Sequence, residues 1–372
     1  MDDARLITVA IHTYDRALSL KSLLEREGVE VTLQNVNLTN PVVSAGVRLR
    51  IKESSLPLAL RIIENQELFS SKSEGESQKK RLILVPVDFS PCSTRACIVA
   101  FHLAYAKNAE IILLHSISDT AAGSRLQLDD SLNFNDKPEE IVNRNSERKQ
   151  AEANMASFTD RLLEMIKDGK MPGVKFETVI QEGLPEEIIN QYTKDNRPEM
   201  IVMGTRGANT KERELIGSVT AEVLDTCRTP VLTIPDEINL EELSKIRRVL
   251  FFSNFDQEDI LALDHLFHLL PLPDSDIVLV KIPSKKSSSN DATALNRLLE
   301  YCRLHYPQRS FSTEQLSVST GDTDFERITE GTPINLIAVP NKKKNAIARL
   351  FNPGIAHRLL FHSDIPMMVL PV

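Results

Sequence analysis

The residues with the clearest potential for chemistry are Gly204-Thr-Arg-Gly207, followed after nine intervening residues by Gly217-Ser218. Two glycines three positions apart let backbone N–H groups approach a phosphate closely, because no side chain stands in the way. Ser218 falls where the N-cap of a following helix is expected, and the N-terminus of a helix favours anions. The spacing predicts a phosphate cradle for a nucleotide, while a purely structural turn is the alternative for Gly204 and Gly207.

A strand and a helix must hold this stretch in place. The apolar run Met200-Ile-Val-Met203 predicts a buried strand before it, and Val219 to Cys227 predicts a helix after it. A second apolar run, Leu82 to Val87, ends in Asp88 and is typical of a central parallel strand that is buried on both faces. Alternation of such strands with helices predicts a doubly wound α/β sheet, in which ligands bind at the carboxyl ends of the strands where the winding reverses.

Taken together, these segments resemble the universal stress protein family, in the subgroup that binds ATP. The match begins at Arg81-Leu-Ile-Leu-Val-Pro-Val-Asp88-Phe-Ser90 and continues through Ile111-Ile-Leu-Leu-His115 and Gly183-Leu-Pro-Glu-Glu187. After the glycine motifs it ends with Thr229-Pro-Val-Leu-Thr-Ile-Pro235, so it covers residues 81 to 235 in order. The resemblance implies that the strands ending in Asp88 and Gly204 are neighbours, so that the carboxylate and the glycine motif meet.

The resemblance also implies a role for each residue of the site. Asp88 would accept hydrogen bonds from the ribose or the adenine, with a helix cap as the alternative. Arg206 is the favoured charge partner of the phosphates, with an exposed surface arginine as the alternative. The base would be lined by Pro86, Val87, Ser116 and Met203, and the phosphates would be surrounded by Gly204, Arg206, Gly207, Gly217, Ser218, Val219 and Thr220.

The expected cofactor is ATP, and Mg²⁺ would arrive with its phosphates rather than on protein side chains. His115 ends a strand and is expected to be packed and hydrogen-bonded. Asp264, His265 and His268 are of metal-binding types, but Phe267-His268 repeats Phe101-His102 on an equivalent helix, so no metal site is predicted.

No nucleophile elbow, Walker lysine or acid–histidine pair is present in the sequence, so no catalytic residue is predicted. We therefore expect an ATP-binding stress-response or signalling protein rather than an enzyme. A slow ATPase or adenylate-forming enzyme is one alternative, and an interaction scaffold without a nucleotide is another.

Composition excludes several classes of protein. A length of 372 residues predicts two or three domains, and a net charge of -8 argues against a nucleic-acid partner. The four cysteines are too sparse for a disulfide framework or a metal site, and packing is their expected role. There is no signal-peptide pattern and no apolar segment of membrane-spanning length, so we expect a cytoplasmic protein without a membrane partner.

The last third of the chain repeats the module before it. Adding 166 carries Leu84 to Leu250, and adding 136 carries Pro230 to Pro366. Proline removes a backbone donor, so the cradle cannot be rebuilt with the same amides, and we expect a degenerate, structural second copy. In it, the residues Asn254, Lys281, Pro340, Lys343, Pro353 and Gly354 replace Asp88, His115, Gly204, Gly207, Gly217 and Ser218.

The first 70 residues show a β-α-β-β-α order that predicts a ferredoxin-like α+β module, with strands near residues 5–13, 29–38 and 47–51 and helices near 15–27 and 54–68. Residues 71–80 have the composition of a linker. Two tandem doubly wound, Rossmann-like domains follow, over 81–237 and 246–372. The turn-rich residues 117–150 predict a surface excursion that could fold over the nucleotide, followed by a helix from about Ser146.

The family resemblance implies that the last strands of the two repeats, Pro230 to Ile234 and Pro366 to Leu370, pair within one chain. A further homodimer stays open at this point.

Overall fold

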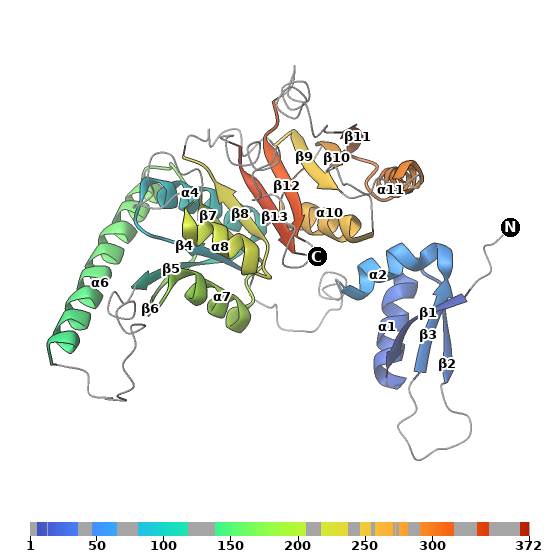
Figure 1. Cartoon of the computed structure of the whole chain (residues 1–372), viewed down its shortest axis with the longest axis horizontal. Coiled ribbons are helices and arrows are strands. Elements are labelled where there is room, and N and C mark those ends of the chain that lie inside the picture. The colour runs from blue at the N-terminus through green and yellow to red at the C-terminus, as the bar shows by residue number, and fades with distance from the viewer. Residues whose placement is uncertain are drawn as a thin grey trace, which may run out of the picture. The chain divides into compact units, whose positions relative to one another are not determined.

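The computed structural model describes residues 6–12, 14–35, 47–64, 81–117, 138–205, 217–236, 246–253, 257–270, 272, 275–281, 291–315, 333–341 and 365–371. The chain divides into two compact units, Met1–Lys79 and Lys80–Val372 (Figure 1).

The first unit has a three-stranded antiparallel sheet in the order β1-β3-β2. The apolar positions of its two helices repeat at helical spacing and pack on this sheet, so that Leu24, Leu49 and Ile62 are fully buried. No fourth strand is present among the described residues, and the ferredoxin-like assignment stays a prediction. Its elements are β1 (Leu6–His12), α1 (Tyr14–Arg26), β2 (Val31–Asn35), β3 (Val47–Lys52), a 3₁₀ turn (Glu53–Ser55) and α2 (Leu56–Glu64).

The second unit is built on a ten-stranded sheet in the order β11-β10-β9-β12-β13-β8-β7-β4-β5-β6. Its strands are β4 (Leu82–Pro86), β5 (Glu110–Ile117), β6 (Phe176–Glu182), β7 (Met200–Gly204), β8 (Val231–Ile234), β9 (Arg248–Ser253), β10 (Asp276–Lys281), β11 (Ser310–Gln315), β12 (Leu336–Asn341) and β13 (Met367–Pro371). The helices are α4 (Pro91–Lys107), α6 (Pro138–Lys167), α7 (Pro185–Asn196), α8 (Ser218–Thr226), α10 (Gln257–Leu269) and α11 (Asp291–His305).

The sheet consists of two five-stranded halves with the same topology. In each half, the strand that comes first in the sequence is central. The second and third strands lie on one side of it, and the fourth and fifth lie on the other. The first strands begin at Leu82 and Arg248, and the last strands begin at Val231 and Met367. These separations, 166 and 136 residues, equal the offsets of the repeat expected from the sequence.

The two halves join by antiparallel pairing of β8 with β13, as expected from the sequence, with Leu232 opposite Met368. The other strand pairs of this sheet are parallel. Beside this junction, the Lys107 ammonium donates to the main-chain oxygen of His268 at 2.8 Å and pairs with Glu199 at 3.4 Å. The halves therefore share one sheet and are also joined by polar contacts, among them Lys107 with His268 and the Asn341 amide, which donates to the main-chain oxygen of Leu224 at 3.2 Å.

Alternate strand residues face opposite layers, which is why the runs are apolar throughout. Ile83 and Val85 belong to a core with α4, α6, α10 and α11, whereas Leu84 belongs to a core with α7 and α8. This double covering confirms the parallel-rich α/β architecture expected from the sequence.

The predicted excursion over residues 117–150 is partly wrong, because α6 begins at Pro138 rather than near Ser146. Proline in the first helical position followed by Glu139 and Glu140 is a helix-start signal that the turn-rich composition obscured. Residues 118–137 lie outside the described residues. Among the described helices, none is long and apolar enough to cross a membrane.

Candidate functional site

The candidate site lies where β4 and β7 end, at the point where the winding of the first half reverses. The chain leaves β4 through α4 toward β5 on one side, and leaves β7 through α8 toward β8 on the other. The two strands pair at Ile83–Met200 and Leu84–Ile201. Beyond this point β4 pairs only with β5, as far as Pro86, and β7 pairs only with β8, as far as Gly204. This is the position at which doubly wound sheets bind ligands.

The turn that follows β4 presents the Asp88 carboxylate at the surface. The carboxylate Oδ1 accepts a hydrogen bond from the main-chain N–H of Ser90 at 3.1 Å. Ser90 itself is the N-cap of α4, and its hydroxyl accepts from the N–H of Ser93 at 3.1 Å. Asp88 therefore stabilises the turn without being the helix cap, and its exposed carboxylate can still accept further hydrogen bonds.

Phe89 occupies a backbone conformation that side chains rarely adopt, with φ of 65°. Its ring is held between His115, with ring centroids 4.3 Å apart, and Phe158, edge-on at 5.6 Å. The Nδ1 atom of His115 lies 2.8 Å from the main-chain oxygen of Val87. The expectation of a packed, hydrogen-bonded His115 is confirmed, whereas nothing in the sequence signalled the role of Phe89.

Gly204 has a packing role that the cradle prediction left out. A Cβ atom at this position would lie 2.6 Å from the Sγ atom of Cys92, so only glycine lets the end of β7 approach α4 this closely. The hydroxyl of Thr220 donates to the main-chain oxygen of Gly204 at 3.0 Å. Both predicted cradle residues therefore have structural contacts inside the protein.

The N-terminus of α8 differs by one residue from the prediction. Gly217 is the N-cap, with extended backbone at φ -66° and ψ 151°, and Ser218 is the first helical residue. Glycine is a favourable N-cap, and the N–H of Gly217 donates to Thr205 at 2.8 Å. No side chain of the described residues caps this helix. The first N–H groups of α8, including those of Ser218 and Val219, are therefore suited to an anion.

The residues expected to line the base lie around the same strand ends but not in one cluster. Val87 belongs to the core on the α4 side of the sheet, and Met203 to the core on the α8 side; each is 4% exposed. Pro86 and Ser116 are half-buried on β4 and β5. Arg206 and Gly207 lie outside the described residues.

The cysteine thiols and the Asp264 carboxylate are buried. All four cysteines are buried, and burial raises the pKa of the Cys97 thiol. Asp264 accepts a hydrogen bond from the hydroxyl of Tyr306. Within the described part of the chain, no group of three or more metal-binding side chains could hold a metal ion.

The model of the Universal stress protein family matches residues 80–235, which include every element of this site. These residues form a universal stress protein domain. Two relatives from Methanocaldococcus jannaschii are 29% identical to it. Universal stress protein MJ0531 aligns over 160 residues, 43% of this chain and 84% of the relative, and universal stress protein MJ0577 over 157 residues, 41% and 93%.

A solved universal stress protein from Archaeoglobus fulgidus DSM 4304 shares the fold with a TM-score of 0.55 at 19% identity. The similarity covers 79% of this chain and 99% of that one, so it extends beyond the universal stress protein domain into the second half of the sheet. Another solved structure is a universal stress protein in complex with cAMP, 22% identical with a TM-score of 0.29, over 42% of this chain and 98% of that one.

Proposed function

We propose that the universal stress protein domain binds ATP at the ends of β4 and β7, and that the protein signals or responds to stress through this binding. The observation that carries the proposal is that β4 and β7 stop pairing before either strand ends. The point where they part lies between an exposed carboxylate and a helix N-terminus. Those two groups match the donors of a ribose and the negative charge of a phosphate.

The described residues fit a nucleotide in the following way. The carboxylate of Asp88 would accept hydrogen bonds from ribose hydroxyls, and the N–H groups of Ser218 and Val219 would donate to phosphate oxygens. Arg206 and Gly207 complete the proposed cradle from the adjoining segment. Mg²⁺ would come with the phosphates and neutralise part of their charge.

We further propose that the second half is a degenerate universal stress protein repeat whose role is structural. Pro340 lies in β12 where the first half has Gly204 in β7, and proline offers no N–H group. Lys281 ends β10 where His115 stands in β5. This half supplies β13 as the pairing partner of β8, in the place of a second subunit.

The test is a count of bound nucleotide. The protein as purified is denatured, any released nucleotide is identified by mass, and the stripped protein is titrated with ATP and, separately, with cAMP. One ATP per chain is the expected result. Two ATP per chain would contradict the degenerate second half, and no binding of either nucleotide would favour an interaction scaffold. Steady release of ADP or of an adenylate would favour an enzyme.

Substitutions test whether the nucleotide counted in this experiment binds at the proposed site. Asp88→Ala should weaken ATP binding by about tenfold or more, because it removes a charged hydrogen-bond acceptor. Gly207→Val should abolish binding without unfolding the protein. The matched control is Asn254→Ala at the corresponding position of the second half, which should leave affinity unchanged. Normal binding by both Asp88→Ala and Gly207→Val would show that the site has been placed wrongly.

A further inference from the structure

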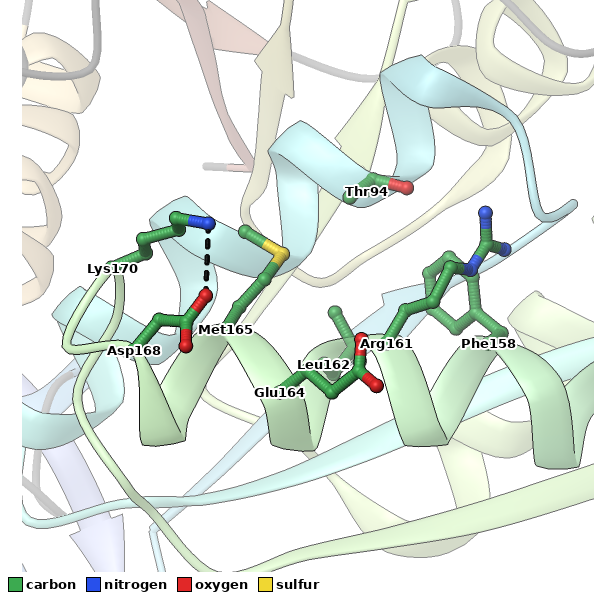
Figure 2. Close-up of a pocket in the computed structure, with 8 residues that line it drawn as sticks. All are labelled: Thr94, Phe158, Arg161, Leu162, Glu164, Met165, Asp168 and Lys170. Carbon is green, nitrogen blue, oxygen red and sulfur yellow. Dashed lines mark hydrogen bonds and ion pairs between the residues drawn. The ribbon is translucent and has the colours of Figure 1, made fainter.

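A pocket of about 250 Å³ lies between α4 and α6, apart from the residues assigned to the nucleotide (Figure 2). Its floor is apolar, because it is lined by Phe158, Leu162 and Met165, of which Met165 is the half-buried one. Its rim is charged and exposed. The lining residues are Thr94 from α4, Phe158, Arg161, Leu162, Glu164 and Met165 from α6, and Asp168 and Lys170 just beyond α6.

Helical spacing and one glycine build this arrangement. Phe158, Leu162 and Met165 recur at intervals of four and three residues and so form one apolar stripe, with the charged residues on the adjoining stripe. Gly169, at φ 73°, ends the helix, and the N–H of Lys170 donates back to Met165 at 2.9 Å. The reversed chain places the Lys170 ammonium 3.0 Å from a carboxylate oxygen of Asp168. A dashed line in Figure 2 marks this pair.

The charges of the rim indicate the class of ligand. Asp168 and Lys170 neutralise each other at one end. At the other end the guanidinium of Arg161 lies 5.4 Å from the centre of the Phe158 ring, and Glu164 follows one helical turn later. A cation and an anion one turn apart above an apolar floor complement a small zwitterion with an apolar side chain. The volume is below the roughly 300–1,000 Å³ of ordinary ligand sites, so it suits a molecule smaller than a nucleotide.

Two residues of the pocket also touch the turn that presents Asp88. The ring of Phe158 packs edge-on against Phe89, with centroids 5.6 Å apart. The hydroxyl of Thr94 donates to the main-chain oxygen of Ser90 at 3.1 Å. A ligand that displaces Phe158 or Thr94 would therefore displace the turn, because packed side chains transmit small shifts.

We propose that this pocket is a second ligand site, which binds a small apolar α-amino acid. The carboxylate of the ligand would pair with Arg161, its ammonium with Glu164, and its side chain would lie on Phe158, Leu162 and Met165. Its binding changes the affinity for ATP by about fivefold or more, a typical coupling between sites. This coupling rests on the proposed nucleotide function, whereas the amino-acid site does not.

Methionine methyl groups report on the two sites separately. Met165 lines the pocket, and Met203 is buried at the end of β7. The full chain, labelled with ¹³C at its methionine methyls, is titrated with leucine and phenylalanine and, in separate samples, with ATP. Met165→Leu and Met203→Leu assign the two signals. Leucine or phenylalanine should shift the Met165 signal saturably, and ATP should shift that of Met203.

The ligand chemistry is tested with analogues and variants. The corresponding acids without an ammonium group and amines without a carboxylate should bind about tenfold more weakly. Arg161→Gln and Glu164→Gln should each weaken leucine or phenylalanine binding to the same extent. Lys167→Gln and Asp160→Asn, two exposed positions of α6 outside the pocket lining, should not.

The outcomes separate the two proposals. No shift of Met165 with either amino acid at about 10 mM, or equal binding by Arg161→Gln, Glu164→Gln and the parent protein, would overturn the amino-acid site. A Met165 response without any Met203 response to ATP would support the site and contradict the nucleotide function. Responses at both methionines with unchanged ATP affinity would refute the coupling alone.

Discussion

The substitution Gly204→Ala separates the packing role of this glycine from its proposed role at a phosphate. The added methyl carbon would lie 2.6 Å from the Sγ atom of Cys92, 3.1 Å from its Cβ and 3.2 Å from its carbonyl carbon. Favourable carbon contacts need about 3.5–4.0 Å, so α4 must move away from the sheet. Overpacking of this kind costs about 1–3 kcal/mol. We expect the upper end, because part of the obstacle is backbone.

Two other glycines provide matched controls. At Gly173 the nearest atom to an added Cβ is a methyl of Ile166 at an ordinary 3.5 Å, so Gly173→Ala should change stability little. At Gly169 nothing lies within 4 Å, but φ is 73°, so Gly169→Ala should cost about 1 kcal/mol from backbone strain alone. The three variants therefore separate steric overlap from conformational strain.

The assay is thermal and urea unfolding followed by circular dichroism, because the chain contains no tryptophan. Gly204→Ala should lower the midpoint by about 4–8 °C, and Gly173→Ala by much less. Combining it with Cys92→Ala should recover part of the loss, which a double-mutant cycle measures. A Gly204→Ala protein as stable as the parent but with weakened ATP binding would refute the packing argument and support the cradle.

Three further outcomes are expected. Partial desolvation and the nearby Lys107 ammonium lower the pKa of His268 from 6.5 to about 4, so the unfolded chain takes up the proton first and stability falls as the pH drops from 6.5 to 4. His268→Gln should lessen that fall in a series of melting curves across this pH range, and an unchanged pH dependence would contradict the role of His268. None of the four buried cysteines should react with a thiol reagent in the native protein, and all should react in denaturant; rapid native labelling would contradict their burial. Tyr306→Phe removes the hydroxyl that donates to buried Asp264 and should destabilise the protein by about 1–3 kcal/mol in urea, against nearly no change for Tyr105→Phe, whose side chain is 67% exposed.

The order of strands and helices in the second unit was predictable because it depends on local patterns. The run Leu82 to Val87 is apolar at every position, since a strand covered on both faces needs apolar side chains on both, and it forms β4. Ser90-Pro91 begins α4, with Ser90 as the cap. The boundary of α6 was missed, because polar residues on an exposed helix resemble those of a loop in composition.

The site was predictable only in its position. The neighbouring ends of β4 and β7 agree with the expectation for Asp88 and Gly204. The roles of individual residues were harder to predict. The N-cap of α8 is Gly217 rather than the predicted Ser218, and Gly204 packs closely against Cys92, which was not predicted. Phe89 was overlooked, since a bulky residue at positive φ has no signature in the sequence.

By itself the sequence determined the kinds of elements in the second unit and their order, because periodicity and turn residues act between near neighbours. Only the tertiary structure decided what met across long separations. The contacts of Cys92 with Gly204 and of Phe158 with Phe89 depend on how α4 and α6 lie on the sheet. Close packing of distant segments sets these contacts, and close packing is a property of the folded chain.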